Sequence, residues 1–69
     1  MELTPVQSEA VAAIGYADGV LYIKWISSGK TYAHPGVSEH THAKLMQAGS
    51  KGQFIAQHIR KQHPGQAIR

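Results

Sequence analysis

The chain has 69 residues, no cysteine, and seven Lys+Arg against four Asp+Glu. This length allows one small domain, residues 1–69, and leaves little room for a large substrate cleft. Without cysteine, disulfides and cysteine-ligated zinc are excluded. No apolar stretch approaches the ~20 residues that span a bilayer, and the first residues lack the basic-then-apolar order of a secretory signal. We therefore expect a cytoplasmic protein with no membrane partner.

Two apolar runs in the N-terminal half predict a β-hairpin with strands over about residues 10–17 and 20–27. They flank Asp18-Gly19, and both of these residues accept the positive φ that a tight hairpin turn requires. Counting outward from this turn places the bulky side chains on one face of the sheet. The expected pairs are Tyr16 with Leu21, Ile14 with Ile23, and Ala12 with Trp25.

A third strand is predicted over about residues 30–34, after a second tight turn at Ser28-Gly29. A two-residue turn there puts Tyr32 opposite Trp25 and His34 opposite Ile23, on the same face as the bulky hairpin residues. Because proline cannot donate to a strand ladder, Pro35 ends the sheet.

Two short helices are predicted in the C-terminal half. Ser38 is a good N-cap for a helix over about residues 39–48. Ser50, with Gln53 three residues later, forms a capping box for a helix over about residues 51–62. Residues 64–69 are expected to fray. The predicted fold is therefore α+β, a three-stranded antiparallel meander followed by two short helices packed on one face. The expected core is Ile14, Tyr16, Leu21, Ile23, Trp25, Tyr32, Leu45, Met46, Phe54, Ile55 and Ile59.

An ordered set of short blocks over residues 6–63 resembles the KTSC domain. The blocks are Ile14-Gly15-Tyr16, Leu21-x-Ile23-x-Trp25, Gly29-x-x-Tyr32-x-His34, Gly36-Val37, Leu45-Met46-x-Ala48, Ser50-Lys51-Gly52 and Ile59-Arg60. That family is named for its occurrence at the C-terminus of some lysyl-tRNA synthetases, and it also forms small free-standing proteins of bacteria and phages. The resemblance implies nucleic-acid binding, with RNA as the usual suggestion. The family's central Tyr-x-Tyr corresponds here to Tyr32 and His34.

The charge is divided unevenly between the two halves. Residues 1–37 carry a net charge of −1 and residues 38–69 a net charge of +4. A basic half favours an anionic partner such as nucleic acid, although a solvated basic helix surface has the same composition. Ser50-Lys51-Gly52 begins a predicted helix, where free N–H groups favour an anion. The candidate nucleic-acid-binding residues are Lys44, Lys51, Arg60, Lys61, Tyr32 and His34.

The face of the sheet away from the helices is predicted to be largely apolar. Antiparallel sheets usually keep such a face polar, and uncovered apolar patches commonly mark association surfaces. The expected residues of this face include Val11, Val20, Tyr22, Lys24 and Ile26. Two alternatives therefore stay open beside RNA binding. The chain forms a homodimer through this face, or it acts as an accessory or phage-encoded regulator that docks on a host enzyme such as the transcription machinery.

The sequence gives little support to catalysis or to a metal site. It holds no cysteine nucleophile, recognisable serine motif or carboxylate pair. His40 and His42 on one helix point about 200° apart, which is poor for joint ligation. We therefore expect no enzyme activity, cofactor or metal.

Overall fold

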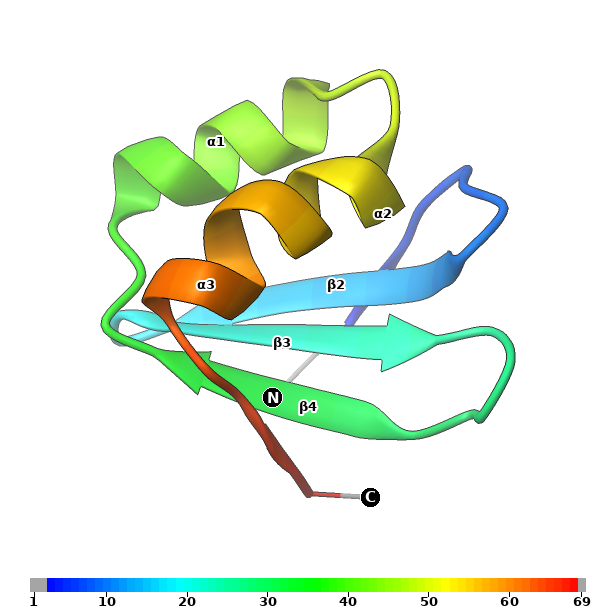
Figure 1. The fold of residues 1–69 in the computed structure, drawn as a ribbon, viewed down its shortest axis with the longest axis horizontal. Helices are drawn as coiled ribbons and strands as arrows, with labels where there is room; N and C mark the ends of the chain where they lie inside the picture. Colours follow the sequence, from blue (N-terminus) through cyan, green and yellow to red (C-terminus); the bar gives the residue numbers. More distant parts are fainter. Residues whose placement is uncertain (1–2, 69) are drawn as a thin grey trace.

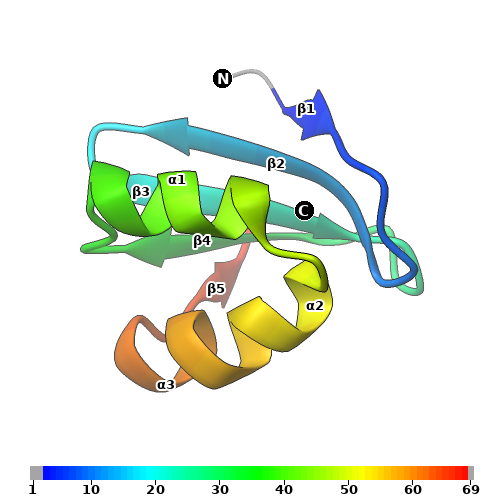
Figure 2. The ribbon, with the colours of Figure 1, turned by 90° about the horizontal axis from the view of Figure 1, so that it is seen from above.

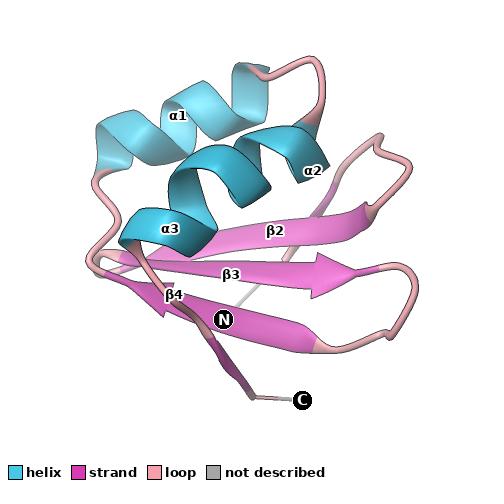
Figure 3. Ribbon diagram, in the orientation of Figure 1, coloured by secondary structure: helices cyan, strands magenta, loops and turns pink. Residues whose placement is uncertain are grey.

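The computed structural model describes residues 3–68 and has an α+β fold (Figure 1). The elements follow in the order β1 (Thr4–Pro5), β2 (Val11–Ala17), β3 (Val20–Trp25), β4 (Thr31–Pro35), α1 (Glu39–Gln47), α2 (Lys51–Phe54), η1 (Ile55–Ile59), α3 (Arg60–Gln62) and β5 (Gln66–Ala67). The segments α2, η1 and α3 run on without a break, and η1 is a π-helical turn. Figure 3 distinguishes the helices from the strands of the sheet by colour. Neither helical segment within residues 3–68 is long and apolar enough to cross a membrane.

The antiparallel sheet has five strands in the order β1-β2-β3-β4-β5, so the prediction of three strands was wrong. The missed strands are the two edges. Thr4 pairs with Ile14 at one edge, and Ala67 pairs with Tyr32 at the other. Each edge strand spans only two residues, too short to show the alternation of apolar and polar residues by which strands are predicted.

The hairpin register is confirmed near its turn and wrong at its far end. Tyr16 pairs with Leu21 and Ile14 with Ile23, as expected. Trp25, however, faces Val11 instead of Ala12, because the register shifts between Val11 and Ala13. Such a β-bulge places one extra residue on one strand and turns the preceding side chain to the opposite face. Val11 is therefore fully buried in the core and does not belong to the outer face of the sheet.

The turn between β3 and β4 is longer than predicted. The backbone N–H of Trp25 donates to Lys30 O at 3.0 Å, which closes a loop over residues 26–29. As a result Tyr32 pairs with Ile23 and His34 with Leu21, instead of with Trp25 and Ile23. The pairing register differs from the prediction by two residues, so the side chains of Tyr32 and His34 still lie on the predicted face of the sheet. Ile26, expected at the end of β3, lies in the loop.

The two helical segments begin where the capping residues predict. Ser38 Oγ accepts from Thr41 N at 3.1 Å, and Ser50 Oγ accepts from Gln53 N at 3.4 Å. The second segment departs from regular α-helix in its middle, where Arg60 N donates to Ile55 O, five residues earlier. Both Ile55 and Ile59 are fully buried, so this wider turn presents the two isoleucines to the sheet.

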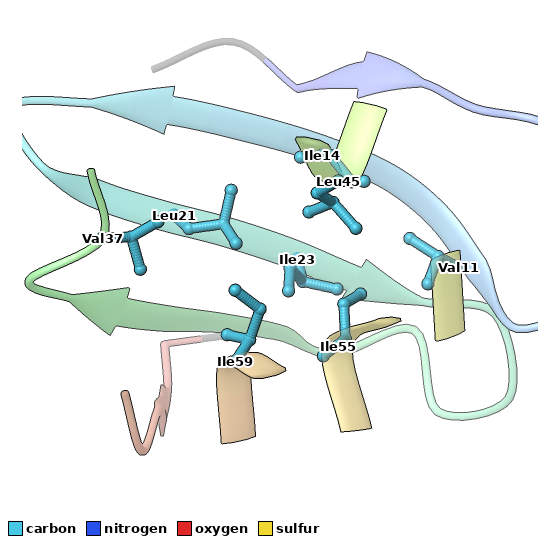
Figure 4. Close-up of a cluster of buried hydrophobic side chains, with 8 residues drawn as sticks. All are labelled: Val11, Ile14, Leu21, Ile23, Val37, Leu45, Ile55 and Ile59. Carbon is cyan, nitrogen blue, oxygen red and sulfur yellow. The ribbon is translucent and has the colours of Figure 1, made fainter. Parts of the chain in front are cut away.

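The core lies between the sheet and the two helical segments, which are on the same side of it (Figure 2). Figure 4 shows the eight buried apolar side chains that meet there. They are Val11, Ile14, Leu21, Ile23, Val37, Leu45, Ile55 and Ile59. Val11 and Val37 were not predicted. Of the other expected core residues, Tyr16, Trp25, Met46 and Phe54 are partly buried against this cluster, and Tyr32 is half-buried.

The C-terminal segment is attached to the sheet through β5. The expectation of a frayed tail over residues 64–69 was therefore wrong for residues 64–68, and Arg69 lies outside the described residues. Ile68 N donates to Thr31 O at 2.8 Å, next to the β4–β5 pairing. His63 O lies 2.8 Å from His34 Nδ1. Gly65 rests on the same imidazole, since a Cβ built there would lie 2.5–2.8 Å from three ring atoms.

This contact predicts that Gly65→Ala destabilises the protein by about 1–3 kcal/mol, because the new methyl group overlaps a buried ring that a hydrogen bond holds in place. Gly49→Ala is the matched control, since nothing lies within 4 Å of a Cβ there. We expect that change to be neutral or slightly stabilising. Chemical denaturation of both variants measures the difference. Equal stability of the two variants would show that residues 63–67 are not packed as described.

Candidate functional site

A pocket of 450 Å³ opens between the end of β3, strand β4 and the C-terminal segment. Its walls come from the end of β3, the loop after it, β4, the start of α3 and the residues before β5. We call it the aromatic pocket. It is lined by Trp25, Ser27, Ser28, Tyr32, His34, Arg60, Pro64 and Gly65.

The aromatic pocket combines flat rings with a positive charge. Trp25 and Tyr32 are half-buried, so each packs one part of its ring on the protein and leaves another part accessible. Arg60 is exposed and supplies a guanidinium group that can pair with a phosphate or carboxylate. Among the described residues that line the pocket, none is acidic. The arrangement suits a ligand with a planar ring and a negative charge.

A second pocket, of 690 Å³, adjoins the first. Trp25 and Arg60 line both, so these two side chains form the boundary between them. Its other lining residues come from the segment before β2 and from the start and middle of the second helical segment. They are Gln7, Ser8, Glu9, Ala10, Gly49, Ser50, Gly52, Gln53 and Ala56. An extended ligand therefore has room on both sides of Trp25.

His34 is the buried polar group of the aromatic pocket, with 4% of its surface exposed. Its Nδ1 is paired with His63 O. Its Nε2 is buried with no hydrogen-bond partner, and it is alone in this among the side-chain nitrogens and oxygens of residues 3–68. Native proteins pair nearly all such atoms, so an unpaired one requires an explanation.

The structure brings three of the six predicted nucleic-acid-binding residues together and leaves three apart. Tyr32, His34 and Arg60 share the aromatic pocket. Lys44 and Lys61 are exposed but do not line it.

Lys51 has a structural contact of its own, because its Nζ donates to Ala48 O at 3.2 Å, at the C-terminal end of α1. It therefore helps to close α1 rather than standing free over the Ser50 cap.

Sequence reasoning missed five of the pocket residues, which are Trp25, Ser27, Ser28, Pro64 and Gly65. Trp25 was assigned to the core, and Gly65 to a frayed tail. The available signal was the position of Trp25 at the end of a strand, directly before a polar loop, where a large ring is only partly covered. Gly65 gives no local signal, since its role depends on packing against His34.

The outer face of the sheet is uncovered by helices (Figure 2) but less open than predicted. Tyr22 lies between Gly15 and Ala33, and Lys24 lies between Ala13 and Thr31. Long side chains thus alternate with short ones across the strands. Ala13 and Thr31 are buried as a result.

The apolar part of this face that stays accessible is small. Val20 and Tyr22 are half-buried, and Ile26 is 53% exposed in the loop that follows β3. Ile68, beside Thr31, is 46% exposed.

The remaining histidines do not assemble a metal site in the described part of the chain, where no three His, Asp or Glu side chains gather closely enough to hold an ion. His42 stacks on Tyr16 with ring centroids 4.7 Å apart, and His58 packs on Phe54 at the same distance. Both rings therefore cover aromatic side chains.

Comparison with known proteins agrees with the family suggested by the sequence blocks. The family model of the KTSC domain matches residues 7–63. The crystal structure of the KTSC domain protein YPO2434 from Yersinia pestis is similar, with a TM-score of 0.88 and 34% sequence identity, over 99% of this chain and 97% of that chain. No curated protein matches the chain. The match to the family model over most of the chain, together with this structural likeness, shows that the chain belongs to the KTSC domain family.

Proposed function

We propose that this chain is a small non-catalytic module that binds single-stranded nucleic acid, RNA in preference to DNA, through the aromatic pocket. The observation that carries the proposal is the meeting of Trp25, Tyr32 and Arg60 in one pocket whose own lining includes no acidic side chain. Glu9 lines the adjoining second pocket. The occurrence of KTSC domains at the ends of some lysyl-tRNA synthetases favours RNA. A volume of 450 Å³ lies within the usual range of small-molecule sites.

Each part of the pocket has a role in this proposal. A base stacks on Tyr32 or Trp25, a contact worth about 1–3 kcal/mol per base and tolerant of sequence. Arg60 pairs with the adjoining phosphate. The net charge of +4 over residues 38–69 attracts the rest of the strand. In this proposal the exposed Lys44 and Lys61 contribute to this attraction without fixing the position of the strand, and Lys51 adds charge near the second pocket.

The composition of the pocket supports the non-catalytic part of the proposal. Acid–base cleavage of RNA needs two groups that exchange protons with the substrate. His34 is the one imidazole lining the pocket among the described residues, and its Nδ1 is already engaged by His63 O.

A pair of charge reversals tests the site. Arg60→Glu is expected to weaken the binding of a labelled eight-nucleotide RNA at least about tenfold, because it puts a carboxylate beside the phosphate. Lys24→Glu changes the net charge equally but lies on the outer face of the sheet, so we expect a much smaller loss. Fluorescence anisotropy measures both affinities, and quenching of Trp25, the sole tryptophan in the chain, reports occupancy of the pocket.

The same titration at several salt concentrations should show a steep fall in affinity as salt rises. Three results would contradict the proposal: equal losses for the two variants, salt-independent binding, or no binding below ~100 µM, since even non-specific nucleic-acid binders typically reach roughly 10⁻⁴–10⁻⁶ M.

A second candidate function is protein association through the outer face of the sheet, either as a homodimer or by docking on a host protein such as the transcription machinery. It is favoured by the exposure of two large apolar side chains, Ile26 and Ile68, and by the half-buried Tyr22 on the outer face. A pull-down from lysate with and without nuclease separates the two candidates, because an RNA-mediated partner is lost on nuclease treatment and a directly bound protein is retained.

If this second function holds, Tyr22→Glu combined with Ile26→Glu should lower the sedimenting mass or abolish capture of the protein partner, because two carboxylates disrupt an apolar contact. Gln57→Glu on the exposed side of the second helical segment is the control for added negative charge. Analytical ultracentrifugation supplies the mass. An unchanged mass together with unchanged partner capture excludes association through this face.

A further inference from the structure

The hydrogen bond between His34 and His63 fixes which nitrogen of the His34 ring carries the proton. The bond joins His34 Nδ1 to a backbone carbonyl oxygen 2.8 Å away. A carbonyl oxygen only accepts, so Nδ1 must be the donor. In a neutral imidazole the other nitrogen, Nε2, then has a lone pair and acts as an acceptor.

This acceptor has nothing to accept from within the described protein. His34 Nε2 has no hydrogen-bond partner, although His34 is almost completely buried, with 4% of its surface exposed. An unpaired buried acceptor destabilises the protein, because it has lost its hydrogen bond to water and gained none in return. Because His34 lines the aromatic pocket, a ligand that brings a hydrogen-bond donor to Nε2 would remove this cost.

The other walls restrict what that donor can be. Arg60 repels a cationic donor such as a lysine or arginine side chain, and it attracts an anion. Tyr32 and Trp25 offer aromatic surface to a planar ring. The ligand that meets these conditions is anionic, flat and equipped with a neutral N–H group. A nucleotide meets all three.

We propose that His34 makes the aromatic pocket selective for bases that carry an exocyclic amino group, which donates to Nε2. This inference rests on the proposed function and names the bases that the pocket prefers. Cytosine, adenine and guanine each carry such an amino group, at N4, N6 and N2 respectively, and uracil carries none. In uracil the place of the cytosine amino group is taken by the O4 carbonyl, and the N3–H donor lies between two carbonyl oxygens. Those oxygens would meet the lone pair of Nε2.

The position of Nε2 adds to the selectivity. The atom has less than 1 Å² of accessible surface, so it lies below the surface of the pocket. An exocyclic amino group extends beyond its ring and reaches farther than a ring N–H. The wall beside the imidazole is Gly65, and its segment is held on the sheet by the exposed β5 pairings and by the His34–His63 and Ile68–Thr31 hydrogen bonds. The β5 pairings are short and exposed and open at low cost, which lets the segment move at Gly65 while His63 O stays bonded to His34 Nδ1.

Oligomers of cytidine and uridine test the inference directly, because the two pyrimidines have the same ring size and differ at position 4. We expect the protein to bind an eight-nucleotide oligo(C) about fivefold more tightly than oligo(U), the effect of one net hydrogen bond. The affinities are measured at pH 8, where cytosine is neutral. His34→Phe should bring the two affinities to within about twofold of each other, while Arg60→Glu should lower both alike.

Nitrogen-15 NMR of the imidazole provides a readout that a purely structural role would not change. In the free protein we expect protonated Nδ1 and unprotonated Nε2 for His34. Addition of cytidine monophosphate should shift the Nε2 resonance in the direction of hydrogen-bond formation, and uridine monophosphate should shift it less. This comparison uses the unaltered protein, so it stands even if His34→Phe fails to fold.

The outcomes separate the two proposals. Equal binding of oligo(C) and oligo(U) by the unaltered protein overturns the amino-group preference and leaves the proposed function intact. A preference for oligo(C) that His34→Phe retains, or an unmoved Nε2 resonance, also overturns it. Failure of both oligomers to bind removes the proposed function, and this inference with it.

Discussion

The fold depends first on the register of the β2–β3 hairpin, which the turn between these strands sets. Asp18 and Gly19 have φ angles of 51° and 76°, in the left-handed region that most residues avoid. With both turn residues fixed in this way, Tyr16 must face Leu21 and Ile14 must face Ile23. A slip of one residue would put Ile14 on the opposite face from Leu21 and Ile23 and would divide the apolar surface on which the helices pack.

The pocket depends on a second, non-local constraint, the attachment of the C-terminal segment to β4. His34 and His63 are 29 residues apart in the chain, and their hydrogen bond joins the sheet to the residue that follows α3. The segment then crosses the ring of His34 at Gly65 and pairs with Tyr32 through Ala67. Without this crossing, Tyr32 and His34 would lie on an open sheet edge, and the wall that Pro64 and Gly65 give the pocket would be missing.

The features that could be predicted from the sequence are those that depend on residues close together in the chain. The hairpin turn, Ser38 and Ser50 act on residues nearby, so the register beside the turn and the starts of both helical segments are correct. The β-bulge could not be predicted in this way, because none of the residues 11–13, Val-Ala-Ala, is specific for a bulge. The extra residue in the bulge turns Val11 toward the core.

The candidate site shows the same division. Tyr32, His34 and Arg60 were each singled out for chemistry or family position, and the structure brings them into one pocket. Trp25 and Gly65 were missed because their part in the pocket comes from tertiary contacts. Only the path of the chain after α3 brings Gly65 to the ring of His34, and no local pattern encodes that path.

The edge strands have a consequence for how the protein can aggregate. A long, unprotected edge exposes a row of free N–H and C=O groups that can recruit a strand from another molecule. Here each edge of the sheet is a strand of two residues, and one of them contains Pro5, which has no N–H to offer. Growth of the sheet from molecule to molecule, the route to fibres, is therefore disfavoured at both sides. The faces of the sheet and the helices are therefore the more favourable surfaces for assembly.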